Sequence, residues 1–130
     1  MSAPPARSPR SKCRGEMGDD MNLLILFAGV SGALAVAAGA FGAHGASGAA
    51  AEWLKTGAHY QLIHAIAALV ALRFDARGPA WLFIAGGAVF ALTLYLMALG
   101  APRWLGAVTP IGGALLIAGW LWFAWGGLRG

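Results

Sequence analysis

Long apolar runs, interrupted by short stretches that carry charge, organise most of this chain. Residues 21–51, 56–72, 78–102 and 104–128 contain no Asp, Glu, Lys or Arg. A transmembrane helix needs ~20 mostly apolar residues, so the four runs predict four membrane-spanning helices. Transmembrane β-strands alternate apolar and polar residues, whereas these runs are uniformly apolar and rich in Ala, Leu and Gly, which excludes a β-barrel interpretation.

The predicted fold is all-α: an integral membrane four-helix bundle in which the helices run alternately up and down. The helices are expected at about residues 23–43, 57–73, 79–99 and 110–128, within one transmembrane domain at 21–130. The second helix is the shortest and the most polar of the four. Its polar side chains are therefore expected to face the interior of the bundle.

Residues 1–20 differ from the rest of the chain. They contain three prolines, four basic and three acidic residues, a composition typical of a flexible tail. Met17 and Met21 are alternatives to Met1 as the true start, because the first apolar run follows Met21 directly. A signal peptide cleaved at Ala49-x-Ala51 is the rival interpretation. Signal peptides have only about 7–15 apolar residues, so the longer run here favours an uncleaved first helix.

The composition agrees with a membrane protein and excludes an ordinary soluble domain. Charged residues make up 11% of the 130 residues and hydrophobic residues 59%, whereas a soluble domain has about 25% charged residues. The net charge of +4 is too diffuse to indicate nucleic-acid binding. Cys13 is the only cysteine, which excludes an internal disulfide and a cysteine-based metal site.

Basic residues are divided unequally between the two ends of the predicted bundle. Both termini and the connection between the second and third helices share one end, which holds seven Lys or Arg residues, while the other end holds Lys55 and Arg103. Cytoplasmic loops carry an excess of basic residues, so both termini are predicted to be cytoplasmic. If the chain begins at Met21, the excess falls to three against two.

Small residues recur at intervals of four along the first predicted helix, and glycines recur in the fourth. Such stripes let neighbouring helices approach closely. We expect them to pack helices within the chain, with a homo-oligomer as the alternative. The candidate packing residues are Ser31, Ala35, Gly39, Ala43, Gly112, Gly113 and Gly119.

The remaining polar side chains gather where the first helix ends and where the second and fourth helices begin. In an alternating topology these three helix ends lie together, which predicts one polar cluster near that end of the bundle. Capping is the favoured role of His44 and of the Thr109–Pro110 pair. The candidate functional residues are His44, Thr56, His59, Tyr60, Gln61, His64, Thr109 and Pro110.

His64 lies deepest in the predicted bilayer, ~12 Å along the helix from Thr56. In one interpretation it is a packing pin, hydrogen-bonded to Tyr60, Gln61 or a residue of another helix. In the other it is a proton or ligand site, since polar residues inside membranes often mark function. The pin is favoured, because intramembrane hydrogen bonds commonly serve packing.

The same residues form an ordered set of motifs. They read Gly39-Ala-Phe-Gly-Ala-His44, Thr56-Gly57-x-x-Tyr60-Gln61-x-x-His64-Ala65, Thr109-Pro110-x-Gly112-Gly113 and Gly119-Trp120. At these positions the sequence resembles the domain of unknown function 423 family of small bacterial inner-membrane proteins. The resemblance covers about residues 26–120 and implies a four-helix fold in the bacterial plasma membrane, without an established activity. It departs from the family at residues 90–95, where Phe-Ala-Leu-Thr-Leu-Tyr stands in place of Phe-Ser-Gly-Ser-Leu-Tyr.

These observations predict a small multi-pass membrane protein that is not an enzyme. No Asp or Glu lies within a predicted span, and His59 and His64 point ~140° apart on a helix, so no catalytic, metal or cofactor site is expected. The alternative is a small oligomeric transporter or channel-like subunit with a polar site around His64. The expected partners are the lipid bilayer and either a homo-oligomer or a larger membrane complex.

Overall fold

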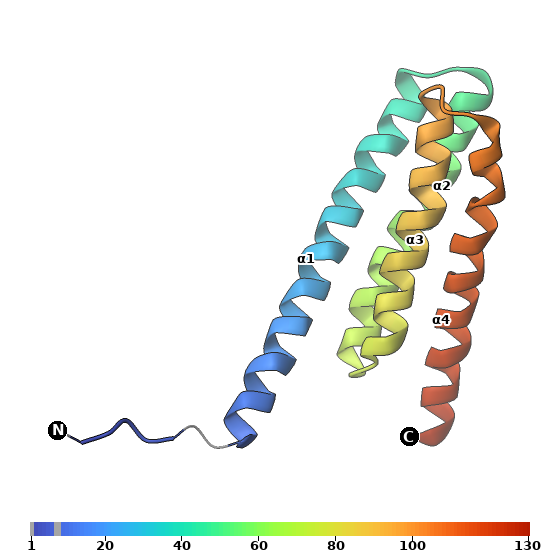
Figure 1. Ribbon diagram of the computed structural model, residues 1–130. Coiled ribbons are helices and arrows are strands. Elements are labelled where there is room, and N and C mark those ends of the chain that lie inside the picture. The colour runs from blue at the N-terminus through green and yellow to red at the C-terminus, as the bar shows by residue number, and fades with distance from the viewer. Residues whose placement is uncertain (1, 7–8) are drawn as a thin grey trace.

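Four long helices form the molecule (Figure 1). The computed structural model describes the backbone of residues 2–6 and 9–130, with side chains for all of these except residues 10–14 and 17. In chain order the elements are α1 (Pro9–His44), α2 (Gly48–Arg73), α3 (Arg77–Ala98), the short 3-10 helix η1 (Arg103–Ala107) and α4 (Thr109–Arg129). The predicted all-α, four-helix architecture is confirmed.

Consecutive helices are antiparallel, so the bundle has two distinct ends. We call the end with residues 44–48 and 99–108 the connector end, because the α1–α2 and α3–α4 connections lie there. The opposite end holds the α2–α3 turn at residues 74–76 and is called the turn end (Figure 1). In the lateral packing α2 lies between α1 and α3, and α4 packs on α3.

Two helices are longer than the sequence predicts. Helix α1 begins at Pro9, so most of the expected flexible tail is helical. Proline suits the first turn of a helix, and extending a helix that has already formed fixes few residues for each hydrogen bond gained. Helix α2 begins at Gly48 rather than near residue 57, because three alanines with high helix propensity follow it.

Three segments of the described chain are long and apolar enough to cross a membrane: Gly18–His44, Arg77–Ala98 and Arg103–Arg129. The first is the greater part of α1, the second is α3, and the third comprises η1 and α4. Helix α2 is more polar, in agreement with the sequence, and its polar side chains Gln61 and His64 are buried. Helix α2 runs antiparallel beside α1 and α3 and packs against both (Figure 1).

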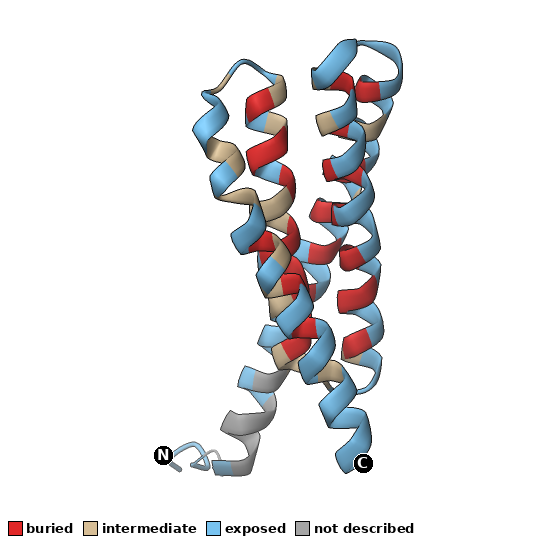
Figure 2. Cartoon of the chain, turned by 90° about the vertical axis from the view of Figure 1, so that its right-hand side faces the viewer, coloured by how far each residue is buried: buried red, intermediate tan, exposed pale blue. Residues whose placement is uncertain are grey.

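The core is thin and consists largely of small side chains. Buried residues form a narrow band between the helices, and the outward surfaces are exposed (Figure 2). Large apolar side chains such as Leu26, Val36, Ile117 and Leu121 are among those exposed. In a bilayer such surfaces face lipid, so helix association depends on close packing and on interhelical hydrogen bonds. The cluster that lines the core is Leu24, Ala28, Ala67, Ala68, Ala71, Ala80, Phe83, Ile84 and Leu116.

A polar network inside the helix bundle

Three interhelical hydrogen bonds join α2, α3 and α4 in pairs. His64 on α2 bonds to Trp120 on α4, Gln61 on α2 to Tyr95 on α3, and Thr93 on α3 to Thr109 on α4. Together they connect each of the three helices to the other two. We call these six residues the polar network.

His64 is held at both ring nitrogens. Its Nδ1 lies 2.7 Å from the backbone oxygen of Tyr60, and the indole Nε1 of Trp120 lies 3.1 Å from its Nε2. A carbonyl oxygen only accepts hydrogen bonds and an indole N–H only donates them. The imidazole must therefore carry its proton on Nδ1 and accept through Nε2, which makes it the neutral tautomer.

Helix α2 starts earlier than predicted, and this changes the depth of His64. It lies ~24 Å along the helix from Gly48 and ~14 Å from Arg73, past the midpoint of α2 toward the turn end. His64 therefore lies deeper in the bundle than the connector end, near which the sequence places the polar cluster. The Trp120 ring, whose centroid lies 6.1 Å from that of the imidazole, is partly exposed, whereas His64 is buried.

Gln61 and Tyr95 form the second pair of the polar network. The Tyr95 hydroxyl donates a 2.7 Å hydrogen bond to Oε1 of the buried Gln61. The Tyr95 ring also covers Gly57, where a Cβ atom would come within 2.7 Å of the ring. Glycine at position 57 therefore lets the ring lie flat enough on α2 for its hydroxyl to reach Gln61.

The two threonines form the third pair, close to the connector end. The hydroxyls of Thr93 and Thr109 are 2.8 Å apart, and the Thr93 hydroxyl also lies 3.0 Å from the backbone oxygen of Val89 and 2.9 Å from that of Phe90. A threonine hydroxyl that donates to its own helix can still accept from a neighbour. This arrangement ties the start of α4 to the last turns of α3.

Aromatic rings enclose the polar network. Phe83 is fully buried, and its ring centroid lies 4.8 Å from that of Trp120 and 5.8 Å from that of His64. On the other side of His64, the Tyr60 ring lies nearly parallel to the imidazole at 6.2 Å and packs on Phe90 at 4.6 Å. The imidazole is thus surrounded by rings, and its polar atoms are satisfied.

Glycines bring α3 and α4 into backbone contact. A Cβ atom at Gly112 would lie 2.5 Å from the backbone nitrogen of Phe90, and one at Gly119 would lie 2.9 Å from the Phe83 ring. At Gly86 a Cβ atom would lie 3.0 Å from the Gly112 carbonyl oxygen. Small residues at a helix interface allow this kind of approach.

The candidate packing residues occupy different environments. On α1, Ser31 and Ala35 are buried, Gly39 contacts Ala58 of α2, and Ala43 is exposed. On α4, Gly112 and Gly119 lie at the contact with α3 described above. Gly113 has more space, since a Cβ atom there would be 3.9 Å from the Phe90 ring.

The candidate functional residues are not gathered into one site. Gln61 and His64 are buried and Thr109 is half-buried. Three residues of the polar network were not predicted as part of any site: Thr93, Tyr95 and Trp120. Trp120 stands in the Gly119-Trp120 motif, which was the one available signal. The candidates that are exposed are His44, Thr56, His59, Tyr60 and Pro110.

Two further observations bear on chemistry. Within the part of the chain that the structure describes, no group of three His, Cys, Asp or Glu residues is placed to hold a metal ion. Among the described side chains, every buried nitrogen or oxygen atom also has a hydrogen-bond partner. The polar network is thus internally satisfied, as expected of groups that link helices.

Comparison with known proteins gives a consistent result. Residues 38–113 match the family described as "Protein of unknown function (DUF423)". The chain is 39% identical over 117 residues to the UPF0382 inner membrane protein YgdD of Escherichia coli, covering 82% of this chain and 89% of that protein. It is 37% identical over 86 residues to a UPF0382 membrane protein of Haemophilus influenzae, covering 62% and 69%. No solved structure matches the chain at a significant level.

Proposed function

Because this chain belongs to the DUF423 family of bacterial membrane proteins, we propose that it is a non-enzymatic, multi-pass protein of the inner membrane that serves as an accessory subunit of a larger membrane assembly. In this proposal the polar network fixes the shape of the bundle. Function then resides in the outer surface that the bundle presents to lipid and to other proteins.

The engagement of both nitrogens of His64 carries this proposal. An imidazole that serves as a proton or ligand site needs a nitrogen available to the substrate. Here Nδ1 faces the Tyr60 carbonyl and Nε2 accepts from Trp120. Binding at either nitrogen would first break one of these hydrogen bonds. The arrangement therefore favours the packing pin over the transporter or channel-like alternative.

The outer surfaces of α1 and α4 support an accessory role. Few of the residues in the apolar part of either helix are buried: 22% in α1 and 17% in α4. A helix with so little intrachain contact has much surface left for lipid and for another protein. A homo-oligomer would use the same surfaces of α1 and α4. Experiment therefore has to distinguish a homo-oligomer from a complex with another protein.

The orientation of the chain belongs to the same proposal. The turn end carries Arg73, Arg77 and Arg129, and the connector end carries Lys55 and Arg103. At the connector end Lys55 is also paired with Glu52 at 3.6 Å. The balance of basic residues supports a cytoplasmic turn end with both termini on that side.

Substitution of His64 tests the pin. His64→Ala is expected to lower the stability of the purified protein in detergent, and His64→Gln to restore part of it, because a glutamine amide oxygen can accept from Trp120. His59→Ala is the matched control, since His59 is exposed on the same helix. Each variant is also expressed in a deletion strain and scored for growth. A His64→Ala protein that is stable but does not complement would overturn the proposal.

Reconstitution tests the transporter alternative. The full-length protein in liposomes is expected to give no flux of protons, K⁺ or Cl⁻ above that of empty vesicles. Native electrophoresis of membrane extracts is expected to find the protein in a complex larger than its purified form. A flux that His64→Ala abolishes would overturn the proposal, as would a purified homo-oligomer of the same size as the extracted complex.

A further inference from the structure

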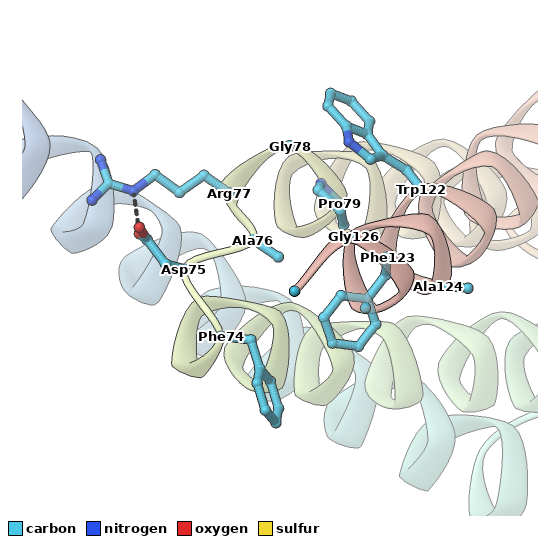
Figure 3. Close-up of a pocket in the computed structure, with 12 residues that line it drawn as sticks. Phe74, Asp75, Ala76, Arg77, Gly78, Pro79, Trp122, Phe123, Ala124 and Gly126 are labelled. Atoms are coloured by element: carbon cyan, nitrogen blue, oxygen red, sulfur yellow. Dashed lines mark ion pairs between the residues drawn. The ribbon is translucent and has the colours of Figure 1, made fainter.

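A cavity of about 980 Å³ lies at the turn end, between the α2–α3 turn and the last turns of α4 (Figure 3). Helix α4 continues past the α2–α3 turn (Figure 1). Its final residues form one wall of the cavity, and the turn forms another. Its apolar lining includes Phe74, Pro79, Trp122, Phe123, Gly126 and Gly127. We call this cavity the turn-end recess.

Glycines shape the recess on both walls. The Trp122 indole lies against Gly78, where a Cβ atom would come within 2.5 Å of the ring. On α4, a Cβ atom at Gly126 or Gly127 would meet nothing within 4 Å. Glycine therefore lets Trp122 close one side, while the two glycines of α4 leave the interior open.

The position of the recess places it at the membrane–water boundary. Helix α2 ends at Arg73, and α3 begins at Arg77 and continues into a strongly apolar segment. Tryptophans are enriched at this level of a bilayer, and Trp122 on α4 is one of the lining residues. An occupant of the recess would thus have its apolar part on the bilayer side and its polar part near water.

Basic residues line the recess or stand next to its lining residues in the chain, and Arg77 is itself a lining residue. Arg73 directly precedes the lining residue Phe74, and Arg129 lies between the lining residues Gly127 and Gly130. Arg129 is positioned over the Trp125 ring at 5.0 Å. The acidic residue at the rim, Asp75, pairs with Arg77 at 3.4 Å, and the two side chains point away from Trp122 (Figure 3). Of the charged side chains at or next to the lining, Arg73, Arg77 and Arg129 are basic and Asp75 is acidic.

We propose that the turn-end recess is a binding site for an anionic phospholipid. The upper part of an acyl chain occupies the space between Phe74, Trp122 and Phe123, and the headgroup phosphate lies near Arg73 and Arg129. Basic pockets between transmembrane helices bind such headgroups. A zwitterionic lipid lacks the net negative charge that matches this rim. The site does not depend on the accessory role proposed above.

Lipid titration of the purified full-length protein tests the site. Native mass spectrometry and thermal unfolding are followed as dioleoyl phosphatidylglycerol, dioleoyl phosphatidylcholine or inorganic phosphate is added. Phosphatidylglycerol is expected to bind saturably, about fivefold or more tightly than phosphatidylcholine. Equal binding of the two lipids would identify the bound molecules as unselective boundary lipid and overturn the proposal. Equal stabilisation by inorganic phosphate would overturn it as well.

Variants locate the site. Gly127→Leu places a side chain in the recess and is expected to abolish the preference for phosphatidylglycerol, as is Trp122→Ala, which removes one wall. Ala118→Leu places the same side chain at an exposed position of α4 and is expected to leave the preference unchanged. The double substitution Arg73→Gln and Arg129→Gln is expected to make the binding of the two lipids equal.

Trp122→Ala adds no bulk, so it still tests whether lipid binds in the recess if Gly127→Leu does not fold. A preference that survives in a folded recess variant, or in the double arginine variant, overturns the proposal.

Discussion

The indole Nε1 of Trp120 donates a hydrogen bond of 3.1 Å to Nε2 of His64. This bond joins α2 to α4, two helices whose main packing is with α3. It also sets the tautomer of the imidazole, because the other ring nitrogen must donate to the Tyr60 carbonyl oxygen at 2.7 Å. The contact thus links α4 directly to α2, in addition to the packing of both on α3.

Trp120→Phe removes the indole donor and keeps an aromatic ring in its place. We expect the free energy of unfolding to fall by about 1 kcal/mol, the size of an interhelical hydrogen bond in a membrane protein. Equilibrium unfolding in mixed micelles measures the change. Trp104→Phe is the control, because Trp104 is exposed in η1. If both variants lost the same free energy of unfolding, the hydrogen bond between Trp120 and His64 would make no specific contribution to stability.

The bond between Tyr95 and Gln61 is suited to a double-mutant cycle. Tyr95→Phe and Gln61→Leu each remove one partner, and we expect a coupling energy of about 0.5–1.5 kcal/mol between them. Tyr60→Phe combined with Gln61→Leu is the control pair, because the half-exposed Tyr60 does not bond to Gln61. Additive effects in the Tyr95 cycle would contradict the hydrogen bond.

Gly112→Ala is expected to disrupt the contact between α3 and α4. The added Cβ atom would lie 2.5 Å from the backbone nitrogen of Phe90, so the two helices must separate. We expect a loss of about 1–3 kcal/mol, the usual cost of overpacking. Gly113→Ala is the adjacent control, since its Cβ atom would be 3.9 Å from the Phe90 ring. Equal stability of the two variants would be inconsistent with the close approach.

Phe83→Ala is expected to leave a cavity beside the polar network. Phe83 is fully buried and its ring packs on Trp120 and His64. We expect the free energy of unfolding to fall by about 3 kcal/mol. Phe41→Ala removes a ring that is half-exposed and should cost much less. The same assay ranks the two variants, and the reverse order would show that Phe83 is not central to the packing.

The bundle itself was predictable from the sequence, and so was much of its packing. Charge-free runs long enough to cross a bilayer predict helices, because a backbone within lipid must satisfy its own hydrogen bonds. The same reasoning placed the first residues of α1 and α2 too late in the chain. Hydropathy reports where lipid begins, whereas a helix continues for as long as its residues have helix propensity, as the alanines after Gly48 do.

The sequence also indicated that His64 needs a hydrogen-bond partner, but not which one. Its neighbours on the same helix, Tyr60 and Gln61, were the obvious candidates. In the structure Gln61 accepts a hydrogen bond from Tyr95, and His64 accepts one from Trp120. Of the two neighbours, only Tyr60 bonds to His64, and it does so through its backbone carbonyl oxygen. Partners on other helices depend on how each helix is rotated and how deeply it is set, and no periodicity within one helix contains that information.

What the sequence alone determined is the set of elements: apolar helices long enough to cross a bilayer, with polarity reserved for a few uncharged side chains and for the ends. What only the tertiary structure decided is which of those side chains meet, and that the end of α4 and the α2–α3 turn enclose a recess. The reason is physical. Secondary structure in lipid follows from local backbone satisfaction, whereas the packing of helices depends on shape complementarity between surfaces far apart in the chain.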